Sequence, residues 1–284
     1  MLQAMSTARS VTFSAYVLWP GRVEQALKDA VRRGAHVTVR LNGYFYKGSE
    51  EMLRDNRNAF RLLHGLGADV QIVHRSDTDG ACLHAKAAVC DGVAFLDDRN
   101  WLDSGDTVLR DDGPAAVRAI RNAASYRSGH CRGVQLDKGS ALKSESGLLR
   151  TSQRDRVDVA AEAIGFWNVY GALKKLADAG AKPRLLISKD GLHKKYLHAA
   201  RLLEKAGVRV RVAATREKFA VVDGTRAWLG SANPTSAYRD ANQVEWGLRT
   251  RDSSIVKALE SHFNAQWRAA APLPAASDKE RVPG

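Results

Sequence analysis

The feature of this sequence that most restricts its fold is an imperfect internal duplication. Residues 23–39 (VEQALKDAVRRGAHVTV) and residues 169–187 (VYGALKKLADAGAKPRLLI) each combine apolar positions at helical spacing with a Gly-Ala pair and an aliphatic run. Such a pattern predicts a helix that ends at glycine and is followed by a strand. A short strand precedes each helix, starting at Val11 and at Val157, and a second helix and strand follow. Two copies of one unit predict two similar lobes.

Each copy predicts the order β-α-β-α-β-β-α. Alternating strands and helices are typical of an α/β fold, so we expect a duplicated fold of two lobes, each with a mixed sheet flanked by helices. The boundaries follow from composition: a first lobe over residues 1–132, a polar linker over 133–156, a second lobe over 157–271 and a flexible tail over 272–284. A functional site is expected where the carboxyl ends of the strands meet.

Charge and composition restrict the partners. The chain has 284 residues and a net charge of +13, which favours phosphate-bearing partners such as nucleic acid or anionic lipid without choosing between them. No apolar run is long enough to span a bilayer, and the first residues lack a secretory signal. Cys82, Cys90 and Cys131 have no metal-type spacing, so buried thiols are expected. These features together predict a cytoplasmic protein and leave its oligomeric state open.

Two sets of polar residues recur at matching places in the two copies. The first copy contains His84-Ala85-Lys86, then Asp91 and Asn100, and the second contains Lys218, Asp223 and Gly230-Ser231-Ala232-Asn233. These sets resemble the HxKxxxxD and GSxN signatures of the phospholipase D superfamily, and the resemblance covers essentially the whole chain. It implies a phosphodiesterase that works through a histidine nucleophile and a phosphohistidine intermediate. The substrate class that it implies is a phospholipid or a nucleic acid.

The chemistry of phosphodiesters explains why these residue types are needed. The substrate is an anion, so attack requires positive charge and hydrogen-bond donors around the non-bridging oxygens. We expect His84 to be the nucleophile, and Asp91 and Asp223 to tie the turns after their strands. The resemblance implies that Glu245, an acidic residue that follows GSxN, orients His84. No cluster with metal-ligand spacing occurs in the sequence, so no metal or other cofactor is predicted. The residues expected to bind phosphate are Lys86, Lys218, Asn100, Asn233, Ser231 and Arg216.

Each copy departs from the signature at a different place. Arg216 stands where the second copy should have histidine, and Asp97-Asp98 replaces the Gly-Ser of the first copy. Aligning the valines puts Leu109 opposite Glu245, so the second acid and its histidine are expected to be missing together. The superfamily uses its second histidine as an acid and base, and arginine is a poor proton shuttle. The candidates to replace it are His193, His198, Glu217, Asp97 and Asp98.

Three functions remain open at this point: hydrolysis of a phosphodiester, binding of a phosphodiester without turnover, and transfer of the phosphoryl group to an alcohol. Trp101 and Trp167 are candidates to stack on a base or line a head-group pocket, although core packing is the commoner role of tryptophan.

Overall fold

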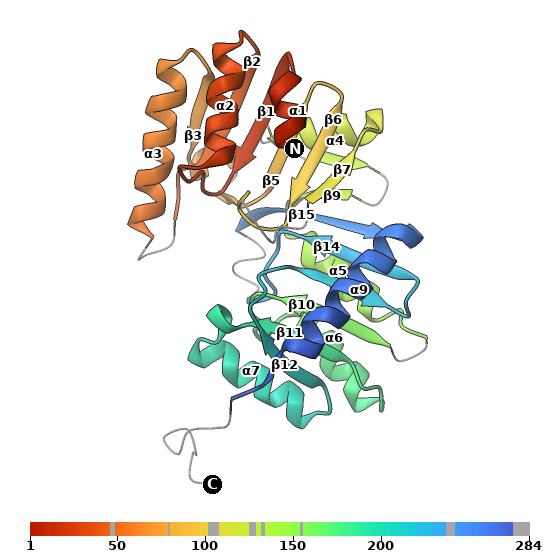
Figure 1. Ribbon diagram of the computed structural model, residues 1–284. Coiled ribbons are helices and arrows are strands. Elements are labelled where there is room, and N and C mark those ends of the chain that lie inside the picture. Colours follow the sequence, from red (N-terminus) through yellow and green to blue (C-terminus); the bar gives the residue numbers. More distant parts are fainter. Residues whose placement is uncertain are drawn as a thin grey trace.

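The chain forms two α/β lobes, the first at the top and the second at the bottom of Figure 1. The computed structural model describes residues 1–45, 49–78, 80–101, 108–124, 129–131, 134–153, 156–236 and 242–274.

The first lobe is built on a six-stranded sheet with the order β3-β2-β1-β5-β6-β7. Strand β1 is parallel to β2 and antiparallel to β5, so the sheet is mixed as predicted. The strands are β1 (Ser10–Ala15), β2 (His36–Asn42), β3 (Asp69–Val73), β5 (Lys86–Cys90), β6 (Val93–Asp97) and β7 (Val108–Asp111). The helices are α1 (Leu2–Thr7), α2 (Arg22–Arg32), α3 (Glu50–Gly65), the short η1 (Arg75–Thr78) and α4 (Pro114–Ala124).

The second lobe repeats this topology with the order β12-β11-β10-β13-β14-β15, and further strands extend its sheet on both sides. Its strands are β10 (Val157–Ala161), β11 (Arg184–Ser188), β12 (Arg209–Ala213), β13 (Phe219–Val222), β14 (Arg226–Gly230) and β15 (Gln243–Thr250). Its helices are α6 (Asn168–Asp178), the short η2 (Lys189–Gly191), α7 (Lys194–Lys205) and α9 (Ser253–Ala269). The identical strand order confirms the duplication read from the sequence. Each repeat has six strands in this order, two more than the four predicted.

The glycines of the two Gly-Ala pairs end the first long helix of each lobe. Gly34 has φ 83° and Gly180 has φ 92°, a left-handed conformation that glycine adopts without steric cost. The following strands bury their aliphatic side chains, among them Val37, Val39 and Leu185. The apolar positions that repeat at helical and strand spacing in the sequence are therefore the positions that are buried in the structure.

The segment between the lobes is more structured than a polar linker. Residues 133–156 contain β9 (Val134–Lys138) and α5 (Ala141–Leu149); β9 pairs with β15 and with the short β8 (Gly129–Cys131). Leu142, Leu148 and Leu149 of α5 are buried in the core of the second lobe, which explains why this segment is ordered. At the other end, β16 (Ala271–Pro272) pairs with β12, and the residues from 275 on lie outside the described part of the chain.

The two lobes share a sheet contact and a core. Strand β4 (Cys82–Leu83) of the first lobe pairs in parallel with β15 of the second, with Leu83 opposite Val244. One buried cluster includes Leu83 and Leu96 from the first lobe and Trp246 and Leu248 from the second. Figure 1 shows β15 where the two lobes meet. In the described residues, no helix is both long enough and apolar enough to cross a membrane.

Candidate active site

His84 lies at the junction of the lobes, between β4 and β5. The backbone N–H groups of His84 and Ala85 donate to the carbonyl of Val244, at 3.0 and 2.7 Å, so the second lobe holds the histidine backbone. The His84 Nδ1 lies 2.9 Å from Oε2 of Glu245. Because an ionised carboxylate can only accept a hydrogen bond, Nδ1 carries the proton and Nε2 keeps its lone pair. This tautomer leaves Nε2 able to act as a nucleophile.

Glu245 is held rigidly beside the histidine. Its side chain is buried, and the Ser231 hydroxyl donates to its Oε2 at 2.5 Å. The Trp246 N–H in turn donates to Ser231 Oγ at 3.0 Å. Burial raises the pKa of Glu245, but His84 and Lys86 outweigh it, so that the pKa is lowered and the carboxylate is ionised. The Ser231 hydroxyl is thus engaged with Glu245, and a contact with phosphate would require this hydrogen bond to open.

Lys86 places a buried ammonium group next to the histidine. Its side chain is 1% exposed, and Nζ lies 3.1 Å from His84 Nδ1 and 5.6 Å from the centre of the Tyr16 ring. Burial lowers the pKa of Lys86 to about 8, although the Glu245 charge opposes this. Burial also lowers the pKa of His84, again against Glu245. The imidazole is therefore neutral near pH 7, as a nucleophile must be.

Lys218 occupies the matching position in the second lobe. It is buried, and Nζ donates to the carbonyl oxygens of Arg216 at 2.8 Å and Asp98 at 3.1 Å. Its charge lowers the pKa of both His84 and Lys86, so the two lysines act on one site. Nζ also lies 3.4 Å from Oε2 of Glu162. The Asn233 Nδ2 donates to that oxygen at 3.2 Å.

Two residues expected to bind phosphate have other neighbours in the described structure. The Arg216 side chain forms an ion pair with Asp190 and is 47% exposed. Asn100 lines a small cavity of about 70 Å³ with Leu18 and Trp19. Among the described residues, no hydrogen bond connects Asn100 to His84 or to Lys218.

The two motif aspartates hold backbone in place, each at the turn after its strand. Asp91 accepts hydrogen bonds from the N–H groups of Arg9 and Ser10. Asp223 accepts from the Ser152 hydroxyl, the Gln153 N–H and Arg226. Both have positive φ, 51° and 55°, a conformation that aspartate tolerates better than most residues.

The five candidates to replace the second histidine have other positions or partners. Glu217 points away from Lys218, as strand alternation predicts, and accepts hydrogen bonds from His262 and Gln266 of α9. Asp97 accepts from the Trp101 N–H, Asp98 accepts from the Lys218 N–H, and His193 and His198 are exposed at and within α7.

The alignment of Leu109 with Glu245 is wrong by three residues. Leu96 pairs with Leu109 in the first lobe, and Leu229 pairs with Leu248 in the second. Leu109 therefore corresponds to Leu248, and the position matching Glu245 is Asp106, which lies outside the described residues. The prediction that the first copy lacks an acid at this position is therefore wrong. Similar residues around Val108 in the first copy and Val244 in the second had suggested the shifted alignment.

Sequence reasoning missed several residues that build the site. Tyr16 packs its ring edge-on against His84, with the ring centres 4.7 Å apart. Asn42 accepts a hydrogen bond from the Leu83 N–H, and Asn56 donates to the Tyr16 carbonyl. Glu162 was missed as well, although it stands directly after a strand of the duplicated unit. The duplication could have identified it, because it occupies the second-lobe position that matches Tyr16.

The burial of Trp101 and Trp167 bears on whether either could stack on a substrate. Trp101 is 6% exposed, packs against Phe13, and donates from Nε1 to the Ser14 carbonyl, so it belongs to the core of the first lobe. Trp167 is partly buried and stands immediately before α6. Stacking by Trp101 would require it to leave this core.

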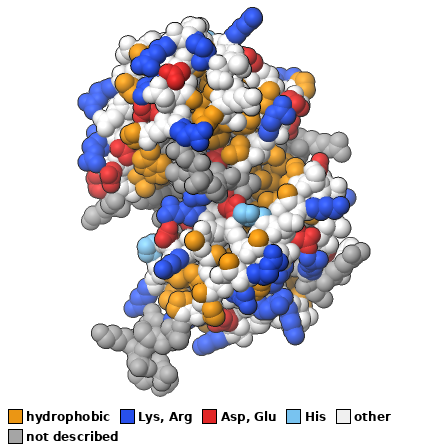
Figure 2. Space-filling view, viewed as in Figure 1, with side chains coloured by type: hydrophobic (Ala, Val, Ile, Leu, Met, Phe, Trp, Pro, Cys, Tyr) orange, Lys and Arg blue, Asp and Glu red, His pale blue; other side chains and the backbone are white. Residues whose placement is uncertain are grey.

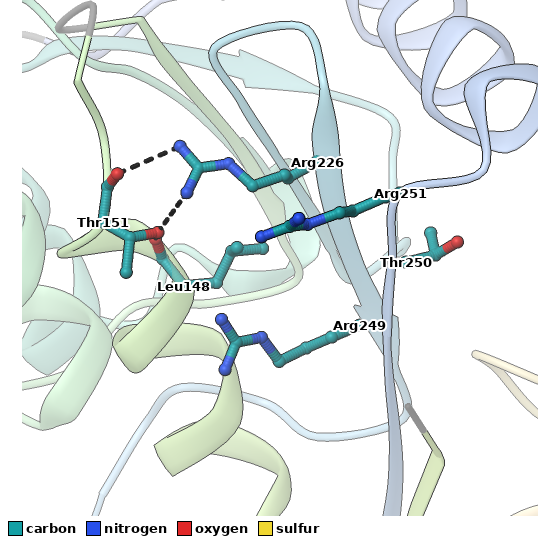
Figure 3. Close-up of a pocket in the computed structure, with 6 residues that line it drawn as sticks. All are labelled: Leu148, Thr151, Arg226, Arg249, Thr250 and Arg251. Atoms are coloured by element: carbon teal, nitrogen blue, oxygen red, sulfur yellow. Dashed lines mark hydrogen bonds between the residues drawn. The ribbon is translucent and has the colours of Figure 1, made fainter. Parts of the chain in front are cut away.

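A separate basic pocket lies at the far end of the same strands. Arg226 starts β14, and Arg249 and Arg251 lie at the end of β15, whereas Ser231 and Glu245 lie at the opposite ends. Figure 3 shows the three guanidinium groups around a pocket of about 380 Å³, with Arg226 bonded to Thr151. On the face drawn in Figure 2, Lys and Arg are spread over both lobes. No group of three His, Cys, Asp or Glu side chains suited to a metal ion occurs in the described residues.

Comparisons with known proteins agree with this architecture. Residues 148–267 match the family model described as cardiolipin synthase, PLD-like domain. The structure is similar to a phosphatidylserine synthase from Haemophilus influenzae, with TM-score 0.70, 12% identity, and coverage of 94% of this chain and 82% of that one. It is also similar to polyphosphate kinase from Porphyromonas gingivalis, with TM-score 0.69 and 12% identity over 99% of this chain. This chain spans only 48% of that kinase.

A search of curated protein sequences found no match. At 12% identity the structural similarities establish the fold alone, while the family model matches the sequence of the second lobe. Residues 148–267 therefore resemble a PLD-like domain in sequence, and the whole chain shares the duplicated α/β fold of these structures, with Arg216 where the second HxK motif would have histidine.

Proposed function

We propose that this protein is a metal-independent phosphodiesterase of the phospholipase D type, with His84 as its nucleophile. One observation carries the proposal: the buried Glu245 carboxylate accepts the Nδ1 proton of His84 and leaves Nε2 unprotonated, in a site where the charges of two buried lysines act on the imidazole. A neutral imidazole with a fixed tautomer is suited to attack on phosphorus. The two ammonium groups supply the positive charge that the transition state requires, so no metal is included.

The reaction has two steps. In the first, the Nε2 lone pair forms a bond to phosphorus, the bond from phosphorus to the leaving oxygen breaks, and that oxygen takes up a proton. In the second, water attacks phosphorus and gives up a proton, and the phosphorus–nitrogen bond breaks to restore His84. Lys86, Lys218 and Asn233 stabilise the charge that develops on the non-bridging oxygens.

The substrate in this proposal is a phospholipid or a nucleic acid. The net charge of +13 favours the polyanion, because each phosphate contact releases counterions from the strand. Transfer to an alcohol instead of water is the second candidate, and it is favoured by the fold shared with a phosphatidylserine synthase. Both candidates use the same first step on His84.

The test is hydrolysis of bis(p-nitrophenyl) phosphate in EDTA, followed as release of nitrophenol. Wild type should turn over, His84→Ala should be inactive, and His198→Ala should match wild type because His198 is exposed on α7. Mass spectrometry after an alkaline quench should find the phosphoryl adduct on His84. A His84→Ala variant as active as wild type would refute the proposal.

The same assay separates an enzyme from a binding protein. An inactive wild type that forms no adduct, together with activity gained in Arg216→His, would show that the fold has been retained for binding phosphodiesters. Adding a short alcohol tests transfer, because a transferase would divert the nitrophenyl phosphoryl group from water to the alcohol.

A further inference from the structure

Glu162 stands at the second-lobe position that faces the missing histidine. Ser14 pairs with Ala87 in the first lobe, and Ala160 pairs with Phe219 in the second. Ser14 and Ala160 are therefore equivalent, and two residues further along the chain Tyr16 is equivalent to Glu162. Since Tyr16 packs against His84 in the first lobe, strand register places Glu162 beside the position, now Arg216, where the second lobe would hold its own histidine.

The backbone of Glu162 is fixed in this position. Its carbonyl accepts a hydrogen bond from the Ser188 N–H at 3.3 Å. Gly191 approaches the same carbonyl so closely that a Cβ there would lie 1.8 Å from the oxygen, so only glycine fits. A fixed backbone at the end of β10 presents the side chain at the site with little freedom to move away.

The Glu162 carboxylate contacts the groups that are expected to bind phosphate. Its Oε2 lies 3.4 Å from Lys218 Nζ and accepts a hydrogen bond from Asn233 Nδ2 at 3.2 Å. The side chain is 36% exposed, in contrast to the buried carboxylates Asp97, Asp98 and Glu245 around the same site. A carboxylate that reaches both solvent and phosphate ligands can exchange protons with water and with a leaving group.

The charges around Glu162 favour its ionised form in the free protein, which is the form that acts as the base in the second step. Burial raises its pKa, but the Lys218 ammonium and the Asn233 hydrogen bond outweigh burial and lower it, and His84 contributes in the same direction. Lys86 is also close enough to interact with its charge. A bound phosphodiester would add negative charge beside Lys218 and so raise the pKa of Glu162 when substrate is present.

We propose that Glu162 is the acid and base of this site, in the role that a second histidine has elsewhere in the superfamily. The proposal rests on the proposed function. In the first step, the Glu162 carboxyl group gives its proton to the leaving oxygen while His84 Nε2 bonds to phosphorus. In the second, the Glu162 carboxylate takes a proton from the attacking water, and the electron pair of the phosphorus–nitrogen bond returns to Nε2. Both residues end as they began.

The two roles can be separated by the choice of leaving group. Nitrophenolate is a stable anion that departs without a proton, so with bis(p-nitrophenyl) phosphate only the second step needs Glu162. The isosteric Glu162→Gln variant should release about one equivalent of nitrophenol per site in a rapid burst. Steady turnover should then fall by about 10²–10⁴-fold, the usual contribution of a general base. The phosphoryl adduct on His84 should accumulate.

The control is Glu204→Gln, which changes an exposed glutamate of α7 and should behave as wild type. Thermal melting of all variants checks folding, and Glu162→Ala carries the same expectation if Glu162→Gln is unstable. Turnover of Glu162→Gln at the wild-type rate would overturn the proposal and leave the phosphohistidine enzyme intact. Loss of the burst in a folded variant would also overturn it. A wild type with neither turnover nor adduct would overturn the proposed function, and this proposal with it.

Discussion

Replacing Lys86 with methionine should change how the stability of the protein depends on pH. The side chain is 1% exposed, and burial lowers its pKa from the ordinary value of 10.5 to about 8. A lowered pKa means that the folded state binds this proton less tightly than the unfolded chain does. At about 1.4 kcal/mol per pKa unit, the difference amounts to about 3 kcal/mol.

The direction of the effect follows from the two pKa values. Below pH 8, Lys86 is protonated in both states, so the folded protein carries the whole cost of the buried charge. Between pH 8 and about 10.5, the folded state releases the proton while the unfolded chain keeps it, so stability rises with pH. Methionine has no proton to release and therefore lacks this rise.

The assay is urea unfolding at several pH values from 7 to 10.5, comparing wild type with Lys86→Met. The difference in unfolding free energy between the two should shift in favour of wild type by about 3 kcal/mol across this range. Groups that titrate in both proteins cancel in the comparison. Lys257→Met, which alters an exposed lysine of α9, should follow wild type at every pH. A wild-type minus Lys86→Met difference that stays constant with pH would refute the reasoning.

Three further predictions concern the site and its support. Glu245→Gln should lower kcat by about 10²–10⁴-fold in a folded protein, because the amide can donate to Nδ1 of His84 and select the wrong tautomer; steady-state kinetics with a melting curve will check this. The pH profile of kcat/KM should fall above about pH 8 as Lys86 loses its proton in the free enzyme, and Lys86→Arg should remove this fall, which initial rates from pH 6 to 10 will reveal. Asp91→Ala should destabilise the protein by about 1–3 kcal/mol, because two backbone N–H groups at the start of β1 lose their acceptor, and chemical denaturation will measure the loss.

Much of the fold could be predicted from the sequence because duplication made each element visible twice. The helices that end at Gly34 and Gly180 and the strands that follow them lie where the periodicity placed them. The segment over residues 133–156 was harder, because the short apolar groups of α5 become informative only when a second lobe is present to bury them. Polar composition alone therefore suggested a linker.

The site was only partly accessible to sequence reasoning. The pairing of His84 with Glu245 was predicted, since the resemblance supplied both the motif histidine and an acidic residue after GSxN that orients it. The direction of Arg216 could not be, because it depends on Asp190 in another loop. Glu162 was not considered, because no motif includes it and its role comes from strand register. Side-chain direction at a strand end is decided by tertiary contacts, and single-residue patterns carry little of that information.

The contact of β4 with β15 has a consequence for how mutations should be tolerated. His84 belongs to the first lobe, while the carboxylate and hydroxyl that position it, Glu245 and Ser231, belong to the second. Tolerance to substitution should therefore depend on whether a residue contacts His84 and its partners, and not on the lobe to which the residue belongs. Each lobe should contain one stretch that accepts few changes, because it completes the surroundings of His84. The matching stretch should accept more changes, except at a residue such as Lys218 that acts on the same site. A mutational scan of the chain would then show a crossed pattern, with the sensitive positions of one lobe mirrored by the permissive positions of the other.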